Sequence, residues 1–163
     1  MRKFTAIPGK GIVANSVVEH AQRVTASSRF ARDYEYNGQL YDQYQIEQIN
    51  IGLDHGVDVD VYADPHYSGG QMYMIRTGLE AGVDTSIYQD TRFDKDQMCV
   101  IRDGLKSGVD VSIYADPKYD WTQMRVIYAG LRDGLDVSSY ADPDMDPWDM
   151  TKIRKALMQQ REE

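Results

Sequence analysis

Matching residues return every 26 positions along most of this chain, and no other feature of the sequence constrains the fold as strongly. Glycine followed by leucine forms the clearest column, and further columns hold isoleucine, methionine or tyrosine. The columns are Gly52, Gly78, Gly104 and Gly130; Ile49, Ile75, Ile101, Ile127 and Ile153; Met72, Met98, Met124 and Met150; and Tyr62, Tyr88, Tyr114 and Tyr140. A chain that repeats its apolar positions in this way is built from similar units, each of which buries its apolar face against its neighbours.

The first half of each repeat predicts an α-helix of about three turns. Asp94 and Gln97 form a capping box, in which each side chain can accept the backbone N–H of the other residue. Apolar residues then follow at helical spacing, and Gly108 is placed to end the helix as a left-handed C-cap. The predicted C-caps are Gly56, Gly82, Gly108 and Gly134.

A second glycine lies inside each predicted helix. Gly104 should cost its helix about 1 kcal/mol relative to alanine, so we expect a compensating close approach by a neighbouring helix or a tyrosine ring. The tyrosine of each repeat is predicted to lie in the core with its hydroxyl at the rim.

The second half of each repeat leaves two interpretations open. Val109, Val111 and Ile113 alternate with polar residues, as in a half-buried strand, which would give strand-plus-helix repeats. Alternatively, Asp110 caps a helix of about a turn and a half that ends before Pro117. We favour the helix, for which the predicted N-caps are Asp58, Asp84, Asp110 and Asp136.

These patterns predict a mainly all-α fold, an α-solenoid of four to five short helical repeats. The repeat domain covers 41–163, with units at about 42–67, 68–93, 94–119 and 120–145 and a truncated unit at 146–163. Residues 1–40 form a predicted N-terminal capping segment, with a turn at Pro8–Gly11 between short β-like stretches and an amphipathic helix over 16–34.

The stretch from Gly108 to Met124, GVDVSIYADPKYDWTQM, resembles tandem repeats in proteins of Gram-positive gut bacteria and of their phages and conjugative elements. The resemblance covers about residues 41–157. It implies a helical repeat and a setting on a mobile genetic element. No activity is established for those repeats, so no catalytic residue is transferred from them.

Charge is divided unevenly along the chain. Residues 1–33 hold six bases and two acids, a net charge of +4, whereas residues 34–163 hold 12 bases and 24 acids, a net charge of −12. The acidic array should repel nucleic acid, so we expect a protein partner there, while the basic N-terminal segment leaves contact with RNA open. We expect a cytoplasmic protein without a membrane segment, because Pro8–Gly11 interrupts the only candidate leader. The sequence leaves open whether the protein forms an oligomer.

Catalytic and metal-binding constellations are not expected. No column supplies a nucleophile, a base and an orienting group together, so the chain is predicted not to be an enzyme and to need no cofactor. Asp142, Asp144, Asp146 and Asp149 suggest a calcium loop, but prolines interrupt them and the loop's glycine is missing. The single cysteine, Cys99, is predicted to be a small core residue.

Recognition is expected at positions that vary between repeats, because repeat scaffolds keep their core columns and change their surface columns. The two variable rows are Tyr73, Cys99, Arg125 and Thr151, and His66, Arg92, Lys118 and Asp144. From these rows the candidate binding residues are Tyr73, Arg125, His66, Arg92, Lys118 and Asp144.

The function that these features favour is a non-enzymatic scaffold that binds a protein partner. An alternative is an acidic inhibitor that mimics nucleic acid and blocks a nuclease or a host defence complex such as restriction or CRISPR.

Overall fold

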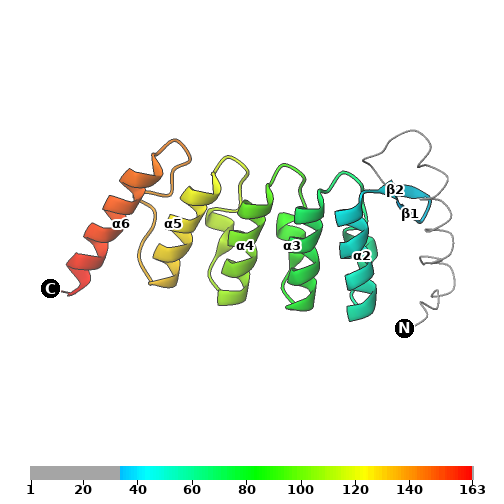
Figure 1. The fold of residues 1–163 in the computed structure, drawn as a ribbon. Helices are drawn as coiled ribbons and strands as arrows, with labels where there is room; N and C mark the ends of the chain where they lie inside the picture. The colour runs from blue at the N-terminus through cyan, green and yellow to red at the C-terminus, as the bar shows by residue number, and fades with distance from the viewer. Residues whose placement is uncertain (1–33, 163) are drawn as a thin grey trace. The chain divides into compact units, whose positions relative to one another are not determined.

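The computed structural model describes residues 34–162, which are mainly helical, as the sequence predicts (Figure 1). This part contains two β-strands, five α-helices and three short 3-10 helices. In chain order they are β1 (Tyr34–Tyr36), β2 (Gln39–Tyr41), α2 (Gln43–His55), η1 (Val59–Val61), α3 (Gly69–Glu80), η2 (Thr85–Tyr88), α4 (Lys95–Ser107), η3 (Val111–Ile113), α5 (Trp121–Arg132) and α6 (Pro147–Glu162). The turn and strands expected between residues 3 and 15, and nearly all of the helix expected over 16–34, lie outside the described residues.

A β-hairpin precedes the first described helix. β1 and β2 pair antiparallel, with Tyr34 opposite Tyr41. Asn37 and Gly38 join the strands with φ of 49° and 77°, and two such positive φ angles are typical of the type I′ turn, whose twist matches that of the strands. This hairpin is not among the elements predicted from the sequence, although the Asn-Gly pair is its usual signal. The predicted domain boundary at residue 40 falls inside β2.

The helices α2, α3, α4 and α5 each begin directly after a residue whose side chain caps the helix. In α4, Asp94 Oδ1 accepts the backbone N–H of Gln97 at 2.8 Å, and Gln97 Oε1 accepts that of Asp94 at 2.7 Å. The same reciprocal pairs occur at Asp42 with Gln45, Ser68 with Gln71, and Asp120 with Gln123. α6 differs, because it starts at Pro147, a residue that needs no N–H partner in the first turn.

The second half of the repeat forms a single 3-10 turn, so the strand interpretation is wrong and the predicted short helix is too long. Asp110 Oδ1 accepts the N–H of Ser112 at 3.0 Å, and the N–H of Tyr114 bonds to the carbonyl of Val111 at 3.0 Å. The N–H of Ala115 also bonds to the carbonyl of Val111, at 2.8 Å, and the 3-10 helix ends at Ile113 after a single turn. In the fourth unit, residues 138–140 form a turn in place of the 3-10 helix.

The invariant tyrosines are core residues, and their hydroxyls point inward rather than to the rim. Tyr62, Tyr88, Tyr114 and Tyr140 each have 0% exposure. The Tyr62 hydroxyl donates to the carbonyl of Gln48 at 2.9 Å, inside the preceding helix of its own repeat. Burial raises the pKa of the Tyr114 hydroxyl above its ordinary value. The prediction of a rim position is therefore wrong, because each hydroxyl packs against the internal glycine of the helix in its own repeat.

The capping glutamine also fastens the loop that leads to the next helix. Gln97 is buried, and its Nε2 donates to the carbonyl of Tyr119 at 2.6 Å. Gln45 makes the same bond to Tyr67 at 2.6 Å, and Gln123 bonds to Met145 at 2.8 Å. One side chain therefore connects the start of a helix to the end of its repeat.

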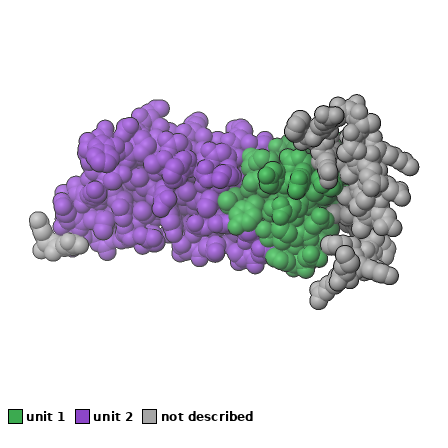
Figure 2. All heavy atoms as spheres, viewed as in Figure 1, with its two compact units in different colours: residues 1–76 green, residues 77–163 purple. Residues whose placement is uncertain are grey.

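The chain divides into two compact units, residues 1–76 and residues 77–163 (Figure 2). In the first unit, α2 packs against the hairpin and η1. In the second unit, α4 packs against α5, and α5 packs against α6. Consecutive long helices of the second unit are therefore neighbours, and the candidate site lies between the first two of them.

Candidate functional site

A groove of about 350 Å³ lies between α4 and α5 in the second unit. It is lined by Asp96, Cys99, Val100 and Asp103 from α4 and by Trp121, Arg125 and Tyr128 from α5. We call this feature the α4–α5 groove. It combines two carboxylates, one guanidinium and two aromatic rings.

Helical periodicity explains why these side chains share one surface. On α4 the lining residues are spaced three, four and seven positions apart from Asp96, and on α5 they are spaced four and seven apart from Trp121. Residues at these spacings lie on the same face of an α-helix. Because α4 and α5 are in contact, their two faces form the walls of one groove.

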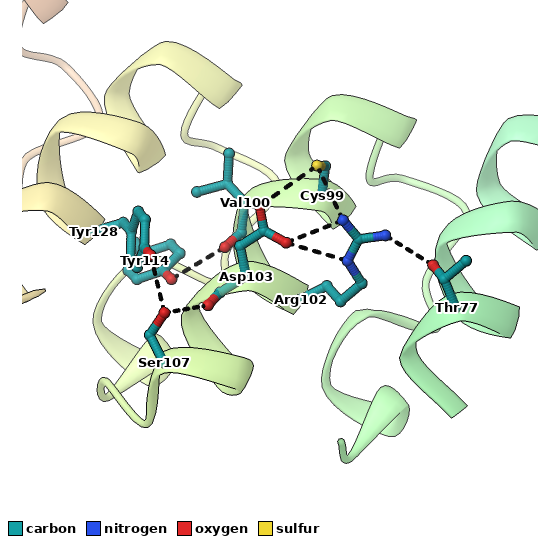
Figure 3. Close-up of polar contacts among 8 residues, drawn as sticks. All are labelled: Thr77, Cys99, Val100, Arg102, Asp103, Ser107, Tyr114 and Tyr128. Atoms are coloured by element: carbon teal, nitrogen blue, oxygen red, sulfur yellow. Dashed lines mark hydrogen bonds and ion pairs between the residues drawn. The ribbon is translucent and has the colours of Figure 1, made fainter. Parts of the chain in front are cut away.

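The α4 wall is held by a polar network centred on Arg102 and Asp103 (Figure 3). Arg102 Nη2 lies 3.0 Å from Asp103 Oδ1, and Arg102 Nη1 donates to Thr77 Oγ1 at 2.8 Å. Asp103 Oδ2 lies 3.9 Å from Cys99 Sγ. The Asp103 carboxylate is thus fixed through one oxygen, while the only donor that residues 34–162 offer its second oxygen is the weak thiol.

Cys99 lies in the wall of the groove and is only partly buried, so its prediction as a core residue is wrong. Burial, with a smaller contribution from the Asp103 carboxylate, raises the pKa of the Cys99 thiol. The thiol is therefore neutral at physiological pH and adds no charge to the groove.

The α5 wall supplies an exposed ring, an exposed cation and a fixed ring. Trp121 is 41% exposed, and Arg125 is exposed without an ion-pair partner among the residues the structure describes. Tyr128 is half-buried, and its hydroxyl lies 2.9 Å from Ser107 Oγ, which in turn bonds to the carbonyl of Asp103 at 2.8 Å. This chain of bonds fixes the Tyr128 ring against α4 (Figure 3).

One predicted variable row lies on the α-helices. Cys99 and Arg125 meet in the α4–α5 groove. Thr151 is half-buried on α6, where its hydroxyl donates to the carbonyl of Pro147 at 2.8 Å. Tyr73, in the first unit, is 42% exposed and its ring faces the Arg76 guanidinium at 5.3 Å. The structure therefore brings two members of this row together.

The other predicted row lies in the turns before the helices. His66, Arg92, Lys118 and Asp144 are all exposed, and none lines the α4–α5 groove. The backbone N–H of each bonds to an aspartate two residues earlier, at 2.9 to 3.0 Å. Arg92 also pairs with its aspartate, Asp90, at 2.6 Å, which lowers the pKa of that carboxyl. These four side chains are surface positions spread along the array.

The acidic excess has a largely structural origin. In residues 34–162, twelve aspartates accept the backbone N–H two residues on: two in the second repeat, where Ser68 replaces the aspartate, three in each of the other full repeats, and one in the truncated unit. They are Asp42, Asp58, Asp64, Asp84, Asp90, Asp94, Asp110, Asp116, Asp120, Asp136, Asp142 and Asp146. This set includes the four predicted N-caps. It is half of the 24 acids that residues 34–163 contain.

The predicted glycine caps have the backbone conformation of a left-handed C-cap. Gly56, Gly82, Gly108 and Gly134 have φ between 70° and 73°, in the left-handed region.

The binding residues predicted from the sequence do not include Asp96, Asp103, Trp121 or Tyr128. Trp121 offered a signal, because its repeat column otherwise holds Gln43, Gly69, Lys95 and Pro147, none of them aromatic. An aromatic residue that appears once in an exposed column is typical of a binding anchor. The other three residues gave no signal without knowledge of which helix faces pair.

The described residues 34–162 contain no group of three or more histidine, cysteine or acidic side chains arranged to hold a metal ion. None of the helices in this range has the length and apolar character needed to cross a bilayer. Comparisons with protein-family models, with curated proteins and with solved structures gave no match.

Proposed function

We propose that this protein is a non-enzymatic repeat scaffold, an α-solenoid in which the repeats stack layer on layer and the α4–α5 groove binds a segment of a protein partner. The observation that carries the proposal is the division between repeated and variable positions. The repeated tyrosines are fully buried, whereas the variable Arg125 is exposed in a groove beside the exposed Trp121. Such a division is typical of scaffolds that bind through surface positions.

The composition of the groove supports a protein ligand. Tryptophan and tyrosine are among the residues most enriched at binding hot spots, and both stand on the α5 wall. Trp121 holds an apolar ring in contact with water, which a partner would cover. The Tyr128 ring is already fixed by its hydrogen bond to Ser107, so binding would cost little additional side-chain entropy at that residue.

The acidic inhibitor is our second candidate, favoured by the net charge of −12 over residues 34–163. Against it, half of those acids are accounted for as caps and turns. A nucleic-acid mimic would bind a basic DNA-handling enzyme with an affinity that falls steeply with salt, whereas groove binding anchored by Trp121 would depend less on salt.

The test uses two tryptophans as a matched pair. Trp121 lies in the groove, whereas Trp148 on α6 is 66% exposed and lies outside it. Wild-type, Trp121→Ala and Trp148→Ala proteins serve as baits in a host lysate, and proteins lost only with Trp121→Ala are identified by mass spectrometry. Calorimetry with the purified partner should then show at least a tenfold loss of affinity for Trp121→Ala and none for Trp148→Ala. Equal affinity for both variants would refute the groove as the binding site.

A further inference from the structure

We propose that the α4–α5 groove accepts a lysine or arginine side chain from a basic segment of the partner. This inference rests on the proposed scaffold function and specifies the chemistry of its ligand. Two carboxylates stand at the ends of the α4 wall, those of Asp96 and Asp103, whose side chains are 53% and 46% exposed.

Both carboxylates retain the capacity to bind a cation. Asp96 faces Lys95 at 3.6 Å, but both side chains are more than half exposed, and such surface pairs are weak. Asp103 Oδ1 accepts from Arg102 at 3.0 and 3.2 Å, while Oδ2 faces the thiol of Cys99 at 3.9 Å. A thiol is a poor donor, so an incoming ammonium or guanidinium would form a much stronger bond with that oxygen.

The opposite wall suits the same ligand. The Arg132 guanidinium already lies over the Tyr128 ring, 5.8 Å from its centroid. The exposed face of Trp121 carries negative potential, which attracts lysine and arginine cations most strongly when water is partly excluded. Their hydrocarbon stems would also cover the exposed part of the Trp121 ring. A carboxylate ligand would gain from Arg125 alone and would meet both Asp96 and Asp103.

Arg125 therefore opposes the proposed ligand and provides the sharpest test. It is exposed, it has no ion-pair partner among the described residues, and it lies in the same groove. If the groove binds a basic side chain, reversing the charge in Arg125→Glu should strengthen binding. If the groove binds an acidic segment, the same substitution should weaken it.

The experiment measures the fluorescence anisotropy of labelled peptides of equal length rich in lysine, arginine or glutamate, with the full chain as receptor. The groove variant is Asp96→Asn with Asp103→Asn. Its control is Glu47→Gln with Asp54→Asn, which removes the same charge from exposed positions on α2, outside the groove. Circular dichroism melts establish that each variant is folded, and the single variant Asp96→Asn replaces the pair if loss of the Arg102 contact unfolds the protein.

The expected result is preferential binding of the lysine and arginine peptides, weakened about tenfold by the groove variant and by less than about twofold by the control pair. Arg125→Glu should strengthen binding about threefold or more. Preference for glutamate peptides, equal losses in both double variants, or no binding of basic peptides would overturn the inference. If a captured partner is lost with Trp121→Ala but unaffected by the groove variant, the scaffold function stands and this inference fails.

Discussion

The hydroxyl end of Tyr114 occupies the space that a side chain at Gly104 would need. A Cβ atom built on Gly104 would overlap the Tyr114 hydroxyl and would lie 2.8 Å from Val111 Cγ1. The same relationship joins Gly52 to Tyr62, Gly78 to Tyr88, and Gly130 to Tyr140. The helix-weakening glycine of each repeat is thus compensated by the packing of a buried ring against the helix backbone.

Replacing Gly104 with valine should destabilise the protein by about 1–3 kcal/mol, because a rigid ring and a 3-10 turn must move to admit the side chain. The free energy of unfolding in urea measures the effect. Ala156 stands in the same column on α6, where it is exposed, so Ala156→Val is the matched control and should change stability by less than about 0.5 kcal/mol. Equal stability of Gly104→Val and wild type would show that the ring does not need this space.

Removing the capping glutamine should cost more than removing an exposed one. Gln97 accepts from the N–H of Asp94 at 2.7 Å and donates to the carbonyl of Tyr119 at 2.6 Å. Gln97→Ala leaves both backbone groups without this partner, so we expect a loss of about 2–3 kcal/mol. The exposed Gln159 on α6 provides the control, and Gln159→Ala should leave the urea midpoint unchanged. Similar midpoints for the two variants would contradict the role of Gln97.

The aspartate that caps each 3-10 turn should act on stability and not on binding. Asp110→Ala removes the acceptor for the N–H of Ser112 and should cost about 1 kcal/mol, whereas Asp110→Asn retains an acceptor and should cost less. Thermal melts compare the two variants, and calorimetry with a captured partner tests binding. A loss of affinity at unchanged melting temperature would assign Asp110 to the binding surface instead.

Stability should fall at alkaline pH because of the buried tyrosines. Burial, with smaller effects from Asp64 and neighbouring groups, raises the pKa of Tyr41 from 10.0 to about 12, and burial raises the pKa of Tyr88 and Tyr114 in the same direction. Above pH 10 the unfolded chain releases protons that the folded chain retains, so stability decreases with rising pH in this window. Urea unfolding should show no tyrosine-dependent loss below pH 9 and a progressive loss above pH 10. Constant stability up to pH 12 would show that these hydroxyls are not buried as described.

The starts of the helices and their glycine ends could be predicted because they depend on local bonds. Asp94, Gln97 and Gly108 specify their roles through residues a few positions away. The extent of η3 could not be settled in the same way, since Val111 and Ile113 fit both a strand and a helix until the Asp110 bond and the burial of Tyr114 are known. The hairpin could have been predicted from Asn37 and Gly38.

The groove depended on information absent from the repeat pattern. Arg125 could be predicted as a binding candidate because its repeat column varies. Its place in a groove depends on Trp121 and on the face of α4 that lies opposite. Which helix faces pair is decided by packing between repeats. The repeat columns of the sequence carry no information on distances across that interface, so Asp96 and Asp103 could not be predicted as groove residues.

The most direct test of the proposed stacking is small-angle X-ray scattering from the full chain in solution. A compact domain of this length has a radius of gyration of about 15 Å. Helical layers spaced about 8–10 Å apart along one axis predict a clearly larger radius and an asymmetric distribution of interatomic distances. A radius near 15 Å with a symmetric distribution would contradict the α-solenoid and the scaffold built on it.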